Sequence, residues 1–148
     1  MTKQKFIPYG RQCIDEEDIQ AVAAVLRSDF LTTGPAVGEF EEALAKIAGA
    51  PYAVAIANGT AALHAAAAVA GVGPGDEVIT SPITFAASAN CALYVGATPV
   101  FADIDEKTFN ISPQFIGKSV TAKTKAIIPV HIFGQAADME EIMKNLPA

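Results

Sequence analysis

A glycine and a hydroxyl residue, Gly59 and Thr60, lie between a short apolar run at 52–57 and an alanine-rich segment at 61–70. The apolar run predicts a buried strand and the alanine-rich segment predicts a helix. A glycine at this turn lets a ligand approach the backbone, and the first amides of a helix favour an anion. The turn, which begins at Asn58, is therefore typical of a phosphate site. The alternative is that Thr60 only caps the helix, because hydroxyl caps are common.

Two further side chains that could line a ligand site follow predicted strands. Phe85 comes after the strand expected at 77–80, where its ring could stack on a planar ligand. Taken alone it favours packing between helix and sheet, because aromatic residues are mostly core residues. His131 follows the strand expected at 125–130 and fits a pocket as well as a structural role. Open α/β sheets bind ligands at these carboxyl ends of their strands.

Several catalytic signatures are absent from the sequence. There is no G-x-S-x-G motif and no Gly-Lys-Ser/Thr of a phosphate loop, and the G-x-G at 71–73 follows a helical segment instead of a strand. Cys13 and Cys91 lack metal-ligand spacing, so no metal site is predicted. Asp103 and Asp105 are expected to form turns, which is the commoner role of loop aspartates.

The elements that must position these residues alternate between strand and helix after two initial helices. Such alternation predicts an α/β fold with a mainly parallel sheet and flanking helices. The second initial helix carries an apolar stripe that is expected to be buried, formed by Val37, Phe40, Leu44 and Ile47. The predicted order is helix 16–27, helix 37–48, strand 52–57, helix 61–70, strand 77–80, helix 85–95, strand 99–102, helix 113–120, strand 125–130 and a helix from 139.

Composition excludes several classes of protein. The chain has 148 residues, 51% of them hydrophobic, so it is not a disordered polypeptide. Its net charge of −6 and the lack of a basic stripe argue against a nucleic-acid partner. No uninterrupted apolar stretch approaches the roughly 20 residues of a membrane-spanning helix, and no secretory signal is visible. With two cysteines in no disulfide pattern, a cytoplasmic location is expected.

Seven linked segments, in order and spacing, resemble the N-terminal part of the DegT/DnrJ/EryC1/StrS family of sugar aminotransferases. Residues 83–90, with Tyr94, most resemble the branch that makes pseudaminic acid precursors. The enzymes of this branch are the UDP-4-amino-4,6-dideoxy-N-acetyl-altrosamine transaminases. The resemblance extends from about Pro8 over nearly the whole chain. The seven segments are 28–35, 40–41, 58–64, 75–79, 82–87, 96–105 and 124–131.

The resemblance implies a pyridoxal 5'-phosphate (PLP) enzyme of fold type I. Gly59 and Thr60, in the turn that begins at Asn58, match positions that hold the cofactor phosphate, and Phe85 matches the aromatic residue that stacks on the pyridine ring. The phosphate interpretation of the turn therefore becomes the favoured one. The alternative for Phe85, packing in the core, becomes the weaker one.

The same resemblance implies a substrate and an amino donor. The substrate is a 4-keto-6-deoxy nucleotide sugar, of the UDP-linked N-acetylhexosamine type in the pseudaminic acid branch, and glutamate is the usual donor. Tyr9, Thr33 and His131 correspond to regions near the sugar-nucleotide pocket. Family members are homodimers, so a homodimer or another self-association is expected.

Residues 1–14 are expected to form an N-terminal arm and residues 15–148 an incomplete large domain. The resemblance places the Schiff-base lysine beyond residue 148, so these residues alone are expected to be inactive. In the family's large domain, strands that come later in the sequence lie between the first strand, here 52–57, and the next three. The resemblance therefore implies that the strand at 52–57 would lack its sheet neighbours in these residues. Two alternatives remain open, a non-catalytic α/β fragment that binds a phosphate or a partner, and a sugar dehydratase of the same family.

Overall fold

The computed structural model describes residues 8 and 10–146 of the 148-residue chain. The chain divides into two compact units, Met1–Ala55 and Ile56–Ala148. The first unit contains two helices, and the second contains the sheet with its flanking helices.

The first unit is built from helices α1 (Glu16–Leu26) and α2 (Pro35–Ala48). Asp15 caps α1, because its side chain accepts hydrogen bonds from two amides of the first turn and its own N–H donates to Asp18. This reciprocal capping satisfies amides that have no partner within the helix. Helix α2 ends at Gly49, whose φ of 63° lies in the left-handed region that glycine adopts without strain.

The prediction of a buried face on the second helix is wrong for this structure. The helix forms at the predicted place, but none of its residues is buried, and Ile47 is 84% exposed. Spacing of apolar residues identifies the face of a helix that can pack, whereas burial also needs a partner surface. The exposed residues of the predicted face are Val37, Phe40, Leu44 and Ile47.

The second unit contains a three-stranded parallel sheet in the order β2-β1-β3. The strands are β1 (Glu77–Thr80), β2 (Thr98–Phe101) and β3 (Thr124–Ile128). Parallel neighbours require a crossover between them, and helices supply these crossovers. The predicted α/β class with a mainly parallel sheet is confirmed.

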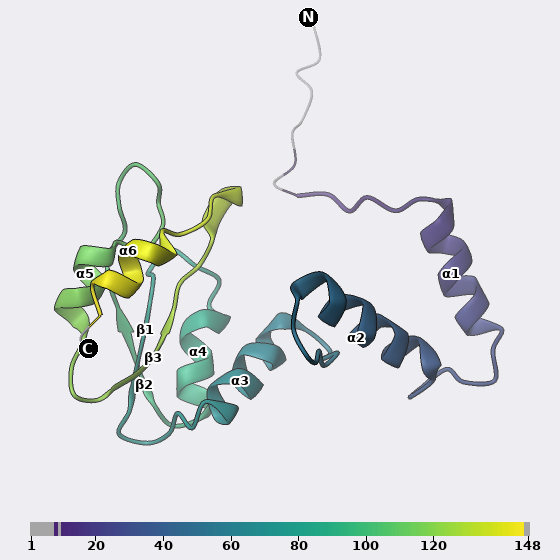
Figure 1. The fold of residues 1–148 in the computed structure, drawn as a ribbon, viewed down its shortest axis with the longest axis horizontal. Coiled ribbons are helices and arrows are strands. Elements are labelled where there is room, and N and C mark those ends of the chain that lie inside the picture. Colours follow the sequence, from purple (N-terminus) through teal and green to yellow (C-terminus); the bar gives the residue numbers. More distant parts are fainter. Residues whose placement is uncertain (1–7, 9, 147–148) are drawn as a thin grey trace, which may run out of the picture. The chain divides into compact units, whose positions relative to one another are not determined.

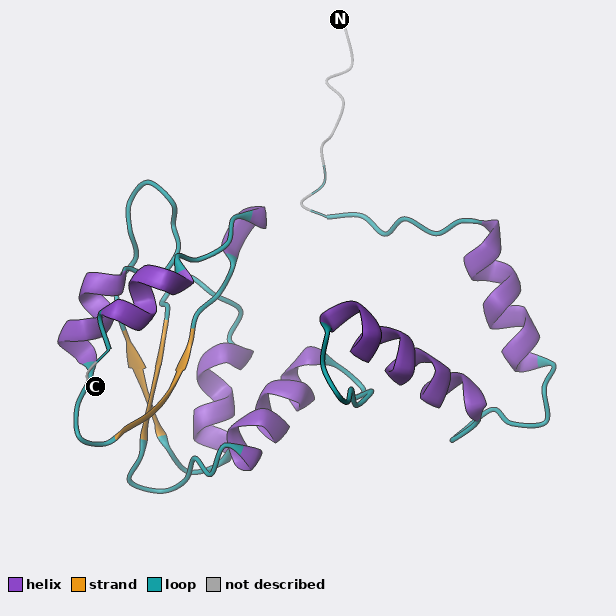
Figure 2. Cartoon of the chain, in the orientation of Figure 1, coloured by secondary structure: helices purple, strands orange, loops and turns teal. Residues whose placement is uncertain are grey.

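Helices cover both faces of this sheet (Figures 1 and 2). Val78 and Ile79 are consecutive in β1 and point to opposite faces, so each belongs to a different apolar cluster. The Val78 cluster includes Cys91 of the helix at Ala87–Tyr94, and the Ile79 cluster includes Ile116 of the helix at Pro113–Ser119. The helices of this unit are α3 (Gly59–Val69), α4 (Ala87–Tyr94), α5 (Pro113–Ser119) and α6 (Met139–Lys144), with a short 3-10 turn at Ile132–Gly134.

The predicted strand at 52–57 is not formed. Tyr52 and Val54 are 87% and 72% exposed, and the N–H of Ala55 donates to Glu41 Oε1 at 2.7 Å. A strand needs a hydrogen-bonded neighbour, and an apolar run alone does not supply one. The extended segment agrees with the expectation that this strand lacks its sheet neighbours.

Candidate functional site

The candidate site is a cleft of about 570 Å³ between the first turns of α3 and the start of α4. It brings together three of the predicted site residues, Gly59, Thr60 and Phe85, which come from two segments separated in the sequence. The remaining lining is apolar except for Ser88. The lining residues are Gly59, Thr60, Ala62, Leu63, Ala66, Phe85, Ala87 and Ser88.

Asn58, not Thr60, caps the helix at this cleft. Its backbone is extended, with φ −167° and ψ 167°, and its side-chain Oδ1 accepts the N–H of Ala61 at 2.9 Å. Its carbonyl oxygen accepts the N–H of Ala62 at 3.1 Å. The alternative in which Thr60 merely caps the helix is therefore wrong, and Thr60 belongs to the first turn itself.

Two backbone donors stay available in that first turn. In the part of the chain that the structure describes, the N–H groups of Gly59 and Thr60 donate to no protein acceptor, and neither does the Thr60 hydroxyl. A Cβ placed on Gly59 would meet no atom within 4 Å, so the space over this backbone is open. Free amides and the positive end of a helix dipole favour an anion such as a phosphate.

Phe85 stands beside this helix end with 76% of its surface exposed. It lies in the loop that leaves the carboxyl end of β1, and helix α4 begins two residues later, at Ala87. Core packing of Phe85, the alternative favoured from the residue type alone, is wrong. An exposed ring in the same cleft as two free amides suits a ligand with a phosphate and a planar ring.

The electrostatics of the cleft come from the backbone. Its lining holds no acidic, basic or histidine side chain, so no carboxylate opposes an anion at the helix end. Beneath it Cys91 is fully buried, and this burial raises the pKa of its thiol. The cleft can therefore bind and orient a ligand, but its lining residues include no group suited to proton transfer at neutral pH.

His131, another predicted site residue, does not line this cleft. His131 follows β3 and its Nδ1 accepts a hydrogen bond from the N–H of Ala137. Thr33 is exposed in the first unit, with a φ of 51° and its hydroxyl on the carbonyl oxygen of Thr32. Tyr9 lies outside the described residues. Asp105 forms a turn, as predicted, because its side chain accepts the N–H groups of the following loop residues.

Thr84 and Ser88 were not expected at the site from the sequence. Their hydroxyl oxygens lie 2.8 Å apart, and Ser88 lines the cleft although it is only 6% exposed. The usable signal was the spacing of four residues between two hydroxyl side chains at the start of a predicted helix.

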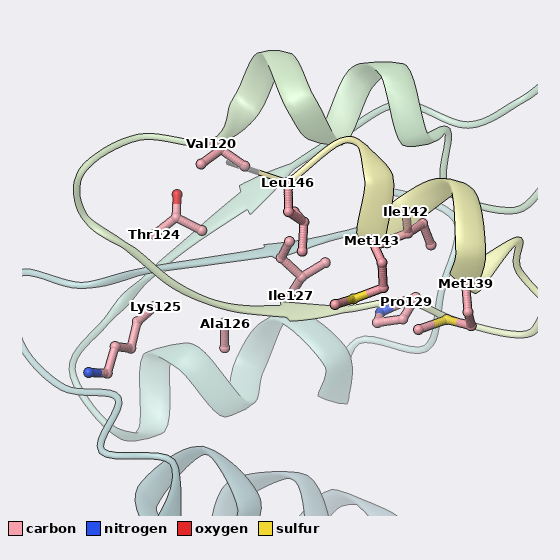
Figure 3. Close-up of a pocket in the computed structure, with 10 residues that line it drawn as sticks. All are labelled: Val120, Thr124, Lys125, Ala126, Ile127, Pro129, Met139, Ile142, Met143 and Leu146. Carbon is pink, nitrogen blue, oxygen red and sulfur yellow. The ribbon is translucent and has the colours of Figure 1, made fainter. Parts of the chain in front are cut away.

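A second hollow lies along β3 and α6, where apolar side chains such as Ile127 and Met143 face one another (Figure 3). Its lining includes one charged residue, Lys125, and no acidic partner for it.

Among the described residues there is no group of three or more potential metal ligands. No helix within residues 8 and 10–146 is long and apolar enough to cross a membrane.

Free helix amides and an exposed ring in one cleft, beside a parallel α/β sheet, form a geometry that favours a phosphorylated ligand with a planar ring. The profile of the DegT/DnrJ/EryC1/StrS aminotransferase family matches residues 12–145. The chain therefore belongs to this family, as its seven segments predicted.

Individual relatives agree with this assignment. The spore coat polysaccharide biosynthesis protein SpsC of Bacillus subtilis is 50% identical over 141 residues, which cover 95% of this chain. Spr1654 of Streptococcus pneumoniae, assigned as a sugar aminotransferase and solved in a PLP-form, superposes with a TM-score of 0.88 at 39% identity over 94% of this chain. An aminotransferase from Psychrobacter cryohalolentis gives a TM-score of 0.86 at 41% identity over 95% of the chain.

These relatives are much longer than the chain. The matches cover 36% of SpsC, 36% of Spr1654 and 36% of the Psychrobacter enzyme. The chain thus corresponds to about a third of each relative, and that third includes the cleft.

Proposed function

We propose that this chain supplies the cofactor-phosphate part of a PLP-dependent aminotransferase that acts on a nucleotide sugar. The observation that carries the proposal is the cleft, where the free amides of Gly59 and Thr60 lie beside the exposed ring of Phe85. Family membership supports it, as does the PLP-form of Spr1654, whose structure this chain resembles.

In this proposal, each cleft residue has one task toward the cofactor. The amides of Gly59 and Thr60, with the Thr60 hydroxyl, hold the phosphate, and Asn58 keeps the helix end in place by capping it. Phe85 supports one face of the pyridine ring and shields it from water. When bound, PLP supplies the electron sink that lets an amino group leave one carbon and join another.

The cleft residues bind the cofactor without carrying out the transfer. No lysine lines the cleft, so the amine that bonds to the cofactor has to come from outside this lining. We therefore propose that residues 1–148 alone do not transaminate, and that residues 15–148 belong to the large domain while 1–14 form an arm.

The proposed substrate is a 4-keto-6-deoxy sugar linked to UDP, of the N-acetylhexosamine type, with glutamate as the donor. The amino group of glutamate replaces the keto oxygen of the sugar, and glutamate becomes 2-oxoglutarate. Tyr9, Thr33 and His131 are proposed to lie near the sugar nucleotide. The proposed pseudaminic acid branch rests on the segment 83–90. A cytoplasmic location is proposed because the two cysteines are free, and a homodimer is proposed from the family resemblance alone.

An isotope-transfer assay tests this function. The enzyme that contains this chain is incubated with PLP, glutamate labelled with 15N, and a UDP-linked 4-keto-6-deoxy-N-acetylhexosamine. Mass spectrometry is expected to show 15N in the sugar product and one 2-oxoglutarate per amino sugar. The matched comparison substrate is 4-keto-6-deoxyglucose linked to thymidine diphosphate, and the difference in amino transfer between the two substrates measures specificity for the nucleotide sugar.

Two results would contradict the proposal. A deoxygenated sugar without 15N would identify a dehydratase of the same family. Absence of any product, with retained binding of phosphate compounds, would identify a non-catalytic binding module.

A further inference from the structure

The position of Phe85 depends on the loop between β1 and α4 that carries it, because its exposed ring is not packed against other residues. Phe85 is 76% exposed, so few contacts of its own ring fix its position. An exposed side chain on a loose loop loses conformational freedom when it binds, and that loss weakens binding. The loop must therefore be fixed by its other residues if Phe85 is to support a ligand efficiently.

Ser88 fixes the two residues at the tip of this loop. Its hydroxyl lies 2.8 Å from the hydroxyl of Thr84, and its backbone N–H donates to the carbonyl oxygen of Phe85 at 3.0 Å. Thr84 and Phe85 are thus each bonded to the same serine. No side chain caps α4 at Ala86, so these contacts add to the bonds that the Ala86 carbonyl oxygen accepts from the N–H groups of Ala89 and Asn90.

Ser88 is itself firmly anchored. It is 6% exposed in α4, next to Cys91 and Ala92, which are fully buried in the core on one face of the sheet. On the other side of the loop, the hydroxyl of the buried Ser81 accepts the N–H of Ile83 at 3.2 Å. The loop that carries Phe85 is therefore connected to buried residues at both ends.

We propose that the Thr84–Ser88 hydroxyl pair is a positioning device that presets Phe85 for stacking on a planar ring bound in the cleft. The inference rests on the proposed function, because the ring in question is that of a pyridoxal phosphate. Neither hydroxyl is a catalytic residue, since both act through the backbone of Phe85. Removing the pair is expected to weaken ring binding and to leave phosphate binding at Gly59 and Thr60 unchanged.

The test compares Thr84→Val with Thr84→Ser in the 148-residue chain. Valine keeps the shape of threonine and removes the hydroxyl, whereas serine keeps the hydroxyl. The ligands are 4-deoxypyridoxine 5'-phosphate, which cannot react with lysines, and inorganic phosphate. Thr121→Val is the matched control, because it removes a hydroxyl that bonds Glu77 at 2.6 Å and does not line the cleft.

Thr84→Val is expected to weaken binding of 4-deoxypyridoxine 5'-phosphate by about three- to tenfold, the usual effect of one lost hydrogen bond. Its affinity for inorganic phosphate stays that of the wild type, and Thr84→Ser restores ring binding. Amide hydrogen exchange of residues 85–88 becomes faster in Thr84→Val and not in Thr121→Val. Thr84→Ala, at a residue that does not line the cleft, repeats these effects if Thr84→Val does not fold.

The outcomes separate the two proposals. Equal affinities of wild type and Thr84→Val for the ring compound would overturn the positioning role and leave the proposed function standing. A parallel loss of phosphate and ring binding would also overturn it, because the pair would then support the whole cleft. A wild-type chain that binds phosphate but no ring compound would overturn the proposed function and the positioning role together.

Discussion

The imidazole Nδ1 of His131 accepts a hydrogen bond of 2.9 Å from the backbone N–H of Ala137. Ala137 is only 4% exposed, so its N–H depends on this acceptor. In the neutral ring the proton therefore sits on Nε2, which stays available as a donor. Asn110 bonds the same loop through Ile132 and Ala136, so the segment after β3 is held at several points. His131 thus has a structural role in this loop.

Replacing His131 by phenylalanine is expected to lower the free energy of unfolding by about 1–3 kcal/mol, because a buried amide loses its acceptor. Urea denaturation followed by circular dichroism measures this change. His64→Phe is the matched control, because the described contacts of that imidazole include only a tilted ring contact with Tyr94 at 5.2 Å. Equal stability of the two variants would show that the Ala137 contact does not hold the loop.

The two cysteines are expected to differ in reactivity. Cys13 is exposed, whereas Cys91 is fully buried and burial raises the pKa of its thiol. The thiolate is the reactive form, so Cys91 should be unreactive in the folded chain. Titration with a disulfide reagent is expected to modify one thiol per chain quickly and the second only after unfolding in guanidinium.

The variant Cys13→Ser assigns the fast reaction. It should abolish fast modification and leave the slow reaction unchanged. A rapid reaction that persists in Cys13→Ser would show that the core around Cys91 opens readily, which the packing of α4 against the sheet does not predict.

The pKa of Asp105 lies below its usual value, chiefly because its carboxylate accepts the N–H of Thr108 and then that of Lys107. A lowered folded-state pKa stabilises the fold above the unfolded-state pKa, and this contribution is lost as the pH falls through the folded-state pKa. Asp105→Asn is therefore expected to be less stable than the wild type at pH 7, with a difference that shrinks on acidification. Thermal unfolding across this pH range measures it.

Glu106→Gln is the control for Asp105, since the Glu106 side chain makes no hydrogen bond among the described residues. It should leave the stability at pH 7 unchanged, because no side-chain hydrogen bond is lost. A difference for Asp105→Asn that stays constant down to acid pH would mean that the loss is steric, not electrostatic.

Gly96 is expected to tolerate no side chain. Its φ of 80° is unfavourable for other residues, and a Cβ there would lie 3.1 Å from Pro74. Gly96→Ala should lower the free energy of unfolding by about 1–3 kcal/mol. Gly73→Ala is the matched control in the neighbouring turn, because a Cβ at Gly73 meets nothing within 4 Å. Similar melting temperatures of the two variants would contradict this account.

The sequence predicted the turn at Gly59 and the loop at Phe85 better than the burial of the elements around them. The turn at Gly59 and the loop at Phe85 could be located because local residue types specify helix starts and strand ends. The exposure of Ile47 and the absence of a strand at 52–57 could not be predicted, because burial and strand formation need partner surfaces that an apolar pattern does not reveal. The exposure of Phe85 could not be predicted from its residue type either, because aromatic residues favour the core and only the structure shows this one exposed.

The most direct test of the cofactor cleft is a 1H–15N correlation spectrum of the chain titrated with 4-deoxypyridoxine 5'-phosphate. Saturable shifts of the Gly59 and Thr60 amides are expected, with a smaller shift at Phe85. The compound without its phosphate should leave Gly59 and Thr60 unmoved at the same concentration. Absence of shifts at these two amides, or equal shifts with both compounds, would contradict the assignment of this helix end as the phosphate site.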